Sequence, residues 1–483
     1  MIVSASPSTN GFAAVNGTVT HSDGTSVPDS KSAANGSKAL NVLPEEFYEL
    51  YLSHVAKNRK PDPIRSLFPL EDLPGVISLL AGKPNSTTFP ITSLQFTTRD
   101  PQSPSEDVKL ELSVDDLAIA LQYTATAGLP DLCEWVYGLQ SYYHGRQKGE
   151  GWKVSIGAGS QDLINKAVAA LVNQGDPVLV EAPVYAGVIP IFQSLDCEMI
   201  EVETDAEGIC SQSIRKVLES WPASRPKPRV LYTVPYGCNP TGMTASRKRR
   251  LEVLELSREH GFLILEDDPY YFLYYGEGER PPSYFALERD QLDVGRVLRF
   301  DSLSKVISSG MRVGFLSGPE PLVRAIDKHT ATANLQPSSL TQMIALKVLQ
   351  CWGYDGFKKH IEEVSQFYRK QRDVFEDAMR RHLAGLAEWI TPEAGMFVWF
   401  KLLLGDSNTA SKTVEHDSNH IIRTKALERG VLALPGTAFL PNGATTAYVR
   451  ASFSTLPPDQ VDEALRRLRE VILDARTSGS QRT

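Results

Sequence analysis

Residues 301–314, with the sequence DSLSKVISSGMRVG, combine hydroxyls, an amine and a guanidinium in one short segment. Ser302 and Ser304 can donate hydrogen bonds to phosphate oxygens, and Arg312 can supply a planar charged donor for the same anion. Lys305 carries an amine that can react with an aldehyde. The segment therefore predicts a site for a phosphorylated aldehyde cofactor that is attached through Lys305. By itself S-x-S-K is also typical of a surface turn with a solvated lysine, so other segments must decide.

The segment 262–271, FLILEDDPYY, places acidic residues at the end of an apolar run. A buried Asp267 is costly unless it faces a cation. A protonated pyridine nitrogen is such a cation, and the pairing keeps the ring positively charged and electron-withdrawing. Tyr270 follows three residues later and can point to the same ring. A solvated acidic turn is the competing interpretation.

The loop 235–242, PYGCNPTG, follows the apolar run 230–234 and fixes Asn239 between two prolines and two glycines. The amide of Asn239 can donate a hydrogen bond to a phenolate oxygen on the same ring. Farther along, the segment 448–453, YVRASF, carries Arg450 among apolar neighbours. Such an arginine suits two-point binding of a carboxylate, although a structural ion pair is the alternative.

The segment 157–162, GAGSQD, precedes an apolar helical pattern, with Ser160 as its expected N-cap. The free amides at the start of a helix bind anions. Most Gly-Ser helix starts bind nothing, so this motif gains weight only from the others.

The elements that must position these residues form an α/β pattern. Short apolar runs at 177–181, 199–202, 230–234, 262–266, 297–300 and 313–317 alternate with helical patterns at 161–173, 211–220 and 245–260. Strands rich in Val, Leu and Ile without alternation are typical of a parallel sheet that is covered on both faces. Ligands of such sheets bind at the carboxyl ends of the strands, where the motifs above lie.

The chain is long enough for two domains at 483 residues, and its net charge of −8 argues against a nucleic-acid surface. We predict a disordered Ser/Gly/Asn-rich tail at 1–40, an N-terminal arm and small-domain segment at 41–80, a large domain at 81–345, a smaller α+β domain at 346–476 and a disordered tail at 477–483. A strand is expected at 77–82 and a polar loop at 404–417. No apolar run is long enough to span a bilayer.

The five cysteines are scattered, without metal-ligand spacing, so reduced thiols and no zinc site are expected. The first 40 residues have neither an apolar core nor an arginine, which disfavours secretory and mitochondrial addresses and leaves the cytoplasm as the expected location.

In their order along the chain these motifs resemble those of pyridoxal-5′-phosphate enzymes of fold type I, the aspartate aminotransferase superfamily. The series AGSQ, EAPVY, NPTG, EDDPYY, DSLSKVISSGMR and RASF is most similar to the kynurenine/2-aminoadipate and fungal aromatic aminotransferase branch, over about residues 43–476. The resemblance implies a mostly parallel seven-stranded sheet in a large domain with a smaller α+β domain, pyridoxal 5′-phosphate as the cofactor, and a homodimer with sites at the subunit interface.

The resemblance also implies a role for each matching residue. Lys305 would hold the cofactor and move a proton, Asp267 would pair with the pyridine nitrogen, and Asn239 and Tyr270 would bind its 3′-oxygen. Tyr185 would stack on the ring, while Ser160, Gln161, Ser302, Ser304 and Arg312 would hold the phosphate. Arg450 would bind the substrate carboxylate, Gly82 would line the pocket, Tyr123 would reach the neighbouring subunit's cofactor, and Arg65 would close over the substrate side chain.

Three residues depart from the branch's usual pattern and bear on substrate choice: Lys83, Tyr236 and Cys238. The expected reaction is transfer of the amino group of Trp, Phe or Tyr to a 2-oxo acid such as 2-oxoglutarate. Kynurenine or 2-aminoadipate is the alternative donor. A C–S lyase and an aminotransferase-like DNA-binding regulator are further rivals, the latter disfavoured by the acidic charge and the polar N-terminal segment.

Overall fold

The computed structural model describes residues 40–71, 73–80, 82–103, 105–404 and 417–480. Apart from their border residues, the tail predicted at 1–40 and the loop predicted at 404–417 lie outside this part of the chain. The remainder contains two packed hydrophobic cores, one around a large sheet and one around a small sheet.

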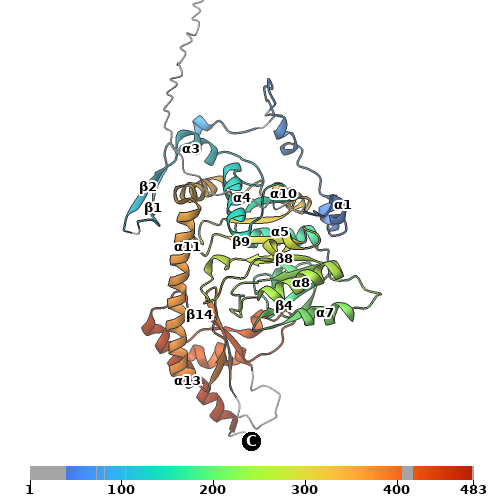
Figure 1. Cartoon of the computed structure of the whole chain (residues 1–483). Coiled ribbons are helices and arrows are strands. Elements are labelled where there is room, and N and C mark those ends of the chain that lie inside the picture. The colour runs from blue at the N-terminus through green and yellow to red at the C-terminus, as the bar shows by residue number, and fades with distance from the viewer. Residues whose placement is uncertain (1–39, 72, 81, 104, 405–416, 481–483) are drawn as a thin grey trace, which may run out of the picture. The chain divides into compact units, whose positions relative to one another are not determined.

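An eight-stranded sheet with the order β3-β10-β9-β8-β7-β4-β5-β6 forms the centre of the large core (Figure 1). Its strands are β3 Trp152–Gly157, β4 Pro177–Ala182, β5 Glu198–Asp205, β6 Gly208–Ile209, β7 Val230–Thr233, β8 Leu263–Asp268, β9 Val297–Ser302 and β10 Gly314–Pro319. The five strands from β9 to β5 run parallel, whereas β10 is antiparallel to β3 and β9. Seven strands span the sheet, and β6 only adds a two-residue hairpin to β5. The predicted α/β fold is confirmed.

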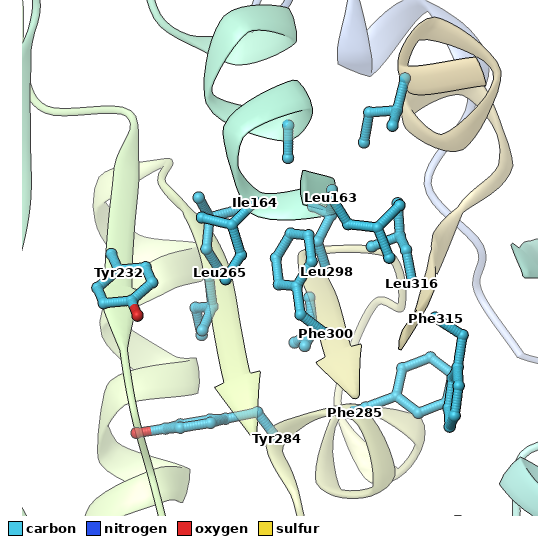
Figure 2. Close-up of a cluster of buried hydrophobic side chains, with 14 of the residues drawn as sticks. Leu163, Ile164, Tyr232, Leu265, Tyr284, Phe285, Leu298, Phe300, Phe315 and Leu316 are labelled. Atoms are coloured by element: carbon cyan, nitrogen blue, oxygen red, sulfur yellow. The ribbon is translucent and has the colours of Figure 1, made fainter. Parts of the chain in front are cut away.

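Helices cover both faces of this sheet. They are α4 Pro130–His144, α5 Ser160–Leu171, α6 Ile189–Gln193, α7 Ser211–Glu219, α8 Arg247–His260, α9 Tyr284–Leu287 and α10 Glu320–Ala333. Figure 2 shows Leu163 and Ile164 of α5 lying against leucines of β8, β9 and β10. The leucine and isoleucine side chains labelled in Figure 2 are almost completely buried. Their removal from water stabilises the packing of α5 on the strands.

Strand alternation separates the three acidic residues at the end of β8. Successive side chains of a strand point to opposite faces, so Asp267 lies on the face that α5 covers, together with Leu265. Glu266 and Asp268 point to the opposite face, although all three residues are buried. Of the three acidic residues, Asp267 therefore points to one side of the sheet, and Glu266 and Asp268 point to the other.

Arg299 of β9 neutralises the acidic residues on that opposite face. Its guanidinium is completely buried and donates to Asp268 at 2.7 Å and to both carboxylate oxygens of Asp301 at 2.7 and 2.9 Å. Asp268 and Asp301 are directly paired across β8 and β9, where like charges destabilise a sheet. Gln140 of α4 adds a hydrogen bond to Asp301 at 3.0 Å. Arg299 thus joins the two strand ends that carry Asp267 and Ser302.

The second core surrounds a four-stranded antiparallel sheet with the order β11-β12-β14-β13. Its elements are β11 Ala387–Trp389, β12 Phe397–Leu402, α12 Ser418–Ile421, a π-helix Ile422–Ala426, β13 Leu434–Pro435, β14 Tyr448–Ser452 and α13 Pro458–Ser480. Since α13 extends to Ser480, residues 477–480 of the predicted C-terminal tail are helical; Thr477 donates to the carbonyl of Leu473 at 3.0 Å.

One long helix, α11 Ser339–Leu383, runs along both cores and is kinked at Gly353 (Figure 1). Gly353 has φ 59° and ψ −174°, a conformation that favours glycine. The helix packs on α3, α4 and α13. Asp116 of α3 pairs with Lys347 before the kink, whereas Trp135 of α4 contacts Tyr354 and Phe357 just after it.

The N-terminal part contains short elements before the sheet begins. They are α1 Glu45–Tyr48, α2 His54–Asn58, the 3-10 turns Arg65–Leu70 and Ser86–Thr88, the hairpin of β1 Gln95–Arg99 with β2 Asp107–Glu111, and α3 Val114–Ala120. The strand predicted at 77–82 is wrong in the described residues, because nothing pairs with it and Ile77 and Leu79 are 92% and 98% exposed. Among the described helices, none is both long and apolar enough to cross a membrane.

The charge cluster under β8 and β9 yields a stability prediction. Replacing Arg299 by methionine leaves Asp268 and Asp301 buried without their cation, so the free energy of unfolding should fall by about 3–5 kcal/mol. Urea denaturation measures the change, with the exposed Arg215→Met variant as the control, which should stay within about 0.5 kcal/mol of the wild type. An Arg299→Met protein as stable as the control would contradict the assigned role.

Candidate active site

A cavity of about 360 Å³ lies at the carboxyl ends of the parallel strands and against the small sheet. It brings together most of the residues predicted from the sequence, and these are Ser160, Gln161, Tyr185, Asn239, Asp267, Tyr270, Ser302, Ser304, Lys305, Arg312 and Arg450. Val234, Pro269, Ser309 and Phe397 complete the lining. Segments nearly 300 residues apart in the sequence thus meet in one place, as the position of strand ends in a parallel sheet requires.

One end of the cavity is a cluster of anion-binding groups. Arg312 donates to the hydroxyl of Ser304 at 3.2 Å, and Ser302 accepts from the amide of Ser304 at 3.2 Å. The helix α5 begins here at Ser160, with Gly159 and not the predicted Ser160 as the N-cap. A Cβ on Gly159 would lie 2.3 Å from an Arg312 nitrogen, so glycine permits the arginine to lie across the helix start. Hydroxyls, a guanidinium and free helix amides together suit a phosphate dianion.

The opposite end of the cavity is defined by Asp267. One carboxylate oxygen accepts a hydrogen bond from the hydroxyl of Tyr232 at 2.5 Å. The other oxygen, Oδ1, is buried and has no hydrogen-bond partner among the described residues. Burial raises the pKa of Asp267 to about 7, with the nearby Asp301 raising it further and Tyr232 and Lys305 lowering it. A cationic donor placed against Oδ1 would satisfy this oxygen and keep the carboxylate ionised.

Lys305 lies between these two ends, in the turn that follows β9. Burial lowers the pKa of its amine, and the positive charge of Arg312 lowers it further, whereas Asp267 raises it. No carboxylate among the described residues forms an ion pair with Lys305. A partly buried amine with a lowered pKa is the kind of lysine that acts as a nucleophile and as a base.

Arg450 enters the cavity from the small sheet and contacts the large one. It donates to Asn239 Oδ1 at 2.8 Å, and its guanidinium carbon lies 4.1 Å from the ring centroid of Phe397 and 5.1 Å from that of Phe439. Burial lowers the pKa of Arg450, and its Nε has no partner among the described residues. A desolvated guanidinium with free donors, clamped between two rings, is arranged for a carboxylate ligand.

Three predicted residues do not line this cavity. Arg65 donates to the carbonyl of Thr124 at 2.9 Å, to the hydroxyl of Thr126 at 3.0 Å and to Gln336 Oε1 at 2.8 Å. Tyr123 is 49% exposed, and no atom lies within 4 Å of a Cβ built on Gly82. Their predicted roles depend on a second subunit or on movement of the N-terminal arm.

The three departures from the family pattern also lie outside the lining. Lys83 pairs with Glu71 at 3.4 Å on the arm, and the buried Tyr236 donates to the carbonyl of Pro281. The thiol of Cys238 contacts the carboxylate of Glu181 at 3.5 Å beneath the Asn239 loop. Within the part of the chain that the structure describes, they therefore do not contact a ligand in the cavity.

Sequence reasoning missed Tyr232 and Phe397. Both occur in apolar strand segments, where an aromatic residue looks like core. Tyr232 pairs with Leu265 on the neighbouring strand, so alternation places it on the same face as Asp267. Phe397 pairs with Ser452 across β12 and β14. Because Ser452 is two residues from Arg450, Phe397 and Arg450 lie on the same face of the small sheet. Knowledge of strand pairing, rather than of residue type, would have found them.

The cavity fits pyridoxal phosphate. The anion cluster can hold the phosphate, the unpartnered Oδ1 of Asp267 can accept from a protonated ring nitrogen, and Lys305 can bind the aldehyde carbon. No group of three or more His, Cys, Asp or Glu residues is placed to hold a metal ion in the described ranges. The donor set is that of an organic phosphate.

Comparison with known proteins agrees with this chemistry. The family model described as aminotransferase class I and II matches residues 97–468. The aminotransferase tdiD of Emericella nidulans is 44% identical over 90% of this chain and 97% of its own. The mitochondrial kynurenine/alpha-aminoadipate aminotransferase of Bos taurus is 37% identical over 89% of this chain and 99% of its own.

An aromatic amino acid aminotransferase of Dictyostelium discoideum is 30% identical over 83% of this chain and 82% of its own. Among solved structures, the kynurenine aminotransferase of Pyrococcus horikoshii, in complex with PMP, has a TM-score of 0.68. It is 28% identical and covers 88% of this chain and 98% of its own.

The raised pKa of Asp267 predicts a pH dependence for the protein freed of cofactor. The folded protein keeps a proton on Asp267 up to about pH 7, whereas the unfolded chain releases it near the ordinary value of 3.8. The free energy of unfolding therefore falls as pH rises from about 4 to 7. Above pH 7 the stability that the protonated Asp267 contributes is lost. Between pH 5 and 8 the wild type should lose about 3 kcal/mol of unfolding free energy relative to an Asp267→Asn variant.

Urea denaturation of both proteins at the two pH values measures this difference, with the exposed Asp290→Asn variant as the control that follows the wild type. Equal pH dependence of the wild type and Asp267→Asn would show that the carboxyl is not protonated when buried without a cation.

Proposed function

Because the chain belongs to the class I and II aminotransferase family, we propose that it transfers the amino group of tryptophan, phenylalanine or tyrosine to a 2-oxo acid such as 2-oxoglutarate. The chain is a pyridoxal-phosphate-dependent transaminase (EC 2.6.1) and acts on amino and 2-oxo acids. The aromatic preference is the proposed step. The observation that carries it is the position of Arg450 between aromatic rings at the substrate end of the cavity.

The proposed mechanism assigns the chain's residues to binding and to proton transfer. When bound, pyridoxal phosphate supplies an electron-withdrawing ring that stabilises negative charge at the substrate Cα. Ser302, Ser304 and Arg312 hold the phosphate, and Asp267 keeps the ring nitrogen protonated. Lys305 removes the proton from the substrate Cα as its neutral amine and returns a proton later. The lowered pKa of Lys305 supports this role, because it increases the neutral fraction.

The lining residues support an aromatic side chain in the substrate. Tyr185, Tyr270 and Phe397 supply ring surfaces, and Phe397 lies edge-on to Tyr270 with 6.2 Å between centroids. Edge-to-face and stacked ring pairs stabilise a complex by about 0.5–1.5 kcal/mol beyond the area that they bury. The proposed binding of the α-carboxylate by Arg450 would place the substrate's side chain beside these rings.

Kynurenine or 2-aminoadipate is the second candidate donor, supported by the bovine relative. An acidic side chain, or the distal carboxylate of 2-oxoglutarate, needs a further cation. Among the described residues, the guanidinium of Arg65 donates only to the uncharged groups of Thr124, Thr126 and Gln336, so it is available to bind one by movement of the arm.

We also propose a homodimer located in the cytoplasm. Apolar residues of the arm between Ile64 and Leu79 are exposed, and Tyr123 is half exposed, as expected of surfaces that a second copy covers. The five cysteines are all free, which is consistent with a reducing compartment.

The central residue of the mechanism is tested by Lys305→Ala. This change removes both the covalent attachment and the base, so transamination should become undetectable and the absorbance of the lysine-bound cofactor should disappear. The exposed Lys370→Ala variant on α11 serves as the control and should keep full activity. Transamination that persists in Lys305→Ala would overturn the mechanism.

The aromatic preference is tested by following the amino-donor half-reaction with each of the twenty amino acids, kynurenine and 2-aminoadipate. Loss of the absorbance of lysine-bound cofactor reports each rate. We expect kcat/KM for at least one of Trp, Phe and Tyr to exceed that for 2-aminoadipate at least tenfold. A Phe397→Ala variant should reduce the aromatic-to-alanine ratio about tenfold, whereas the exposed Phe367→Ala should not. Faster reaction with 2-aminoadipate would favour the second candidate instead.

A further inference from the structure

A second cavity of about 480 Å³ lies beside the candidate active site, also between the large and small sheets. It is lined by Ala182, Pro183, Thr204, Thr241, Met243, Glu388, Trp389, Ile390, Trp399, Leu440, Thr446 and Tyr448. None of these residues lines the first cavity. Its volume is in the range of small-molecule sites.

Four segments contribute one residue to each of the two cavities, and in every segment these two residues are two positions apart. Asn239 lines the first cavity and Thr241 the second, within one loop. The other pairs, first cavity named first, are Tyr185 and Pro183, Phe397 and Trp399, and Arg450 and Tyr448. On β12 and β14 this spacing keeps both members on one face of the small sheet. The second cavity is thus an extension of the surface that carries the carboxylate-binding arginine.

The walls of the second cavity suit an aromatic ring. Trp399 and Tyr448 are stacked with their centroids 5.2 Å apart and their planes 7° apart. Tyr448 and Ile390 remain 36% and 47% exposed, so each still has surface to cover. Threonine hydroxyls from Thr241 and Thr446 lie among these apolar walls and can form hydrogen bonds with a polar group on the ring.

The charges around the second cavity favour a neutral ligand. Among the described residues of the lining, Glu388 is the only carboxylate, and none is a lysine or arginine that could bind an anion. Lys401 pairs in register with both Glu388 and Tyr448 on the neighbouring strands and is not part of the lining. An amino acid or 2-oxo acid would leave its carboxylate unpaired here, in contrast to the first cavity with Arg450.

A continuous series of ring contacts joins the two cavities. Trp399 packs edge-on against Phe439 with 5.7 Å between centroids, and Phe439 contacts the guanidinium of Arg450. Trp399 and Arg450 are also directly paired across β12 and β14. We propose that the second cavity is an effector site for a neutral aromatic small molecule, whose occupant acts on Arg450 through Trp399 and Phe439.

The binding part of the proposal is tested with indole as the probe. Isothermal titration of the cofactor-loaded enzyme should show indole binding that persists when 3-phenylpropionate saturates the first cavity. Indole-3-acetate, which adds a carboxylate, should bind the second cavity at least tenfold more weakly. Displacement of indole by 3-phenylpropionate, or no indole binding, would overturn the proposal.

Two variants locate the site. Tyr448→Ala removes the stacked wall and Ile390→Ala removes an apolar one, so each should weaken indole binding about fivefold or more. Tyr142→Ala is the matched control, because Tyr142 is 46% exposed and stacks on Tyr354 but lies on α4, outside this lining. Equal indole affinity in Tyr448→Ala and Tyr142→Ala would exclude the second cavity as the site.

The effector part is tested by steady-state kinetics with the best donor amino acid. Saturating indole should change KM at least twofold with little change in kcat, since Arg450 is proposed to bind the donor's carboxylate, and Tyr448→Ala should lose this response. Bound indole that leaves KM unchanged would refute the action on Arg450. The comparison of the Tyr448→Ala, Ile390→Ala and Tyr142→Ala titrations uses neither turnover nor a donor, so its outcome is independent of the donor that the enzyme prefers.

Discussion

The structure depends on the burial of one carboxylate, Asp267, at the end of a parallel strand. A buried carboxylate with an unpaired oxygen is unfavourable unless a cation meets it. Tyr232 satisfies one oxygen, and the other faces the cavity without a partner among the described residues. The protein thus holds a group whose preferred state needs a ligand with a positively charged donor. Binding of such a ligand would contribute stability as well as chemistry.

Four cations near the strand ends differ in their partners, because Arg299 pairs with carboxylates whereas Lys305, Arg312 and Arg450 form no ion pair with a described carboxylate. Arg299 is fully committed to Asp268 and Asp301 on the far face of the sheet. Arg312 lies at the start of α5, where it donates to the carbonyl of Ala158, and Arg450 enters the cavity from the small sheet. Burial lowers the pKa of both Lys305 and Arg450, because water solvates these charges less in the cavity than at the surface. An anionic phosphate and a carboxylate would therefore be bound strongly in this cavity.

The residues that sequence reasoning found are those whose polar character is out of place in apolar surroundings. Asp267, Asn239, Lys305 and Arg450 follow or interrupt apolar runs, and the rule for strand ends predicts that they meet. Tyr232 and Phe397 were not found, because an aromatic residue in a strand is equally consistent with core. The partition of the EDD acids between two faces required the register of β8 and β9. The hairpin β1–β2 and the strand β3 were also missed, and the apolar run at 77–82 was misassigned for want of a pairing partner.

The helix α11 belongs to both hydrophobic cores, because it continues from the large core through its kink at Gly353 to the small core. Phe357 and Ile361, just beyond the kink, are buried in the large core, whereas Phe375 and Met379, farther along, are buried in the small core. The part of α11 beyond Gly353 is therefore fixed to both cores by packing, and a shift of one core relative to the other would break these contacts or bend the helix. At Gly353 itself a Cβ would meet no atom within 4 Å, so a larger residue there would be disfavoured by the positive φ of 59° and not by a clash.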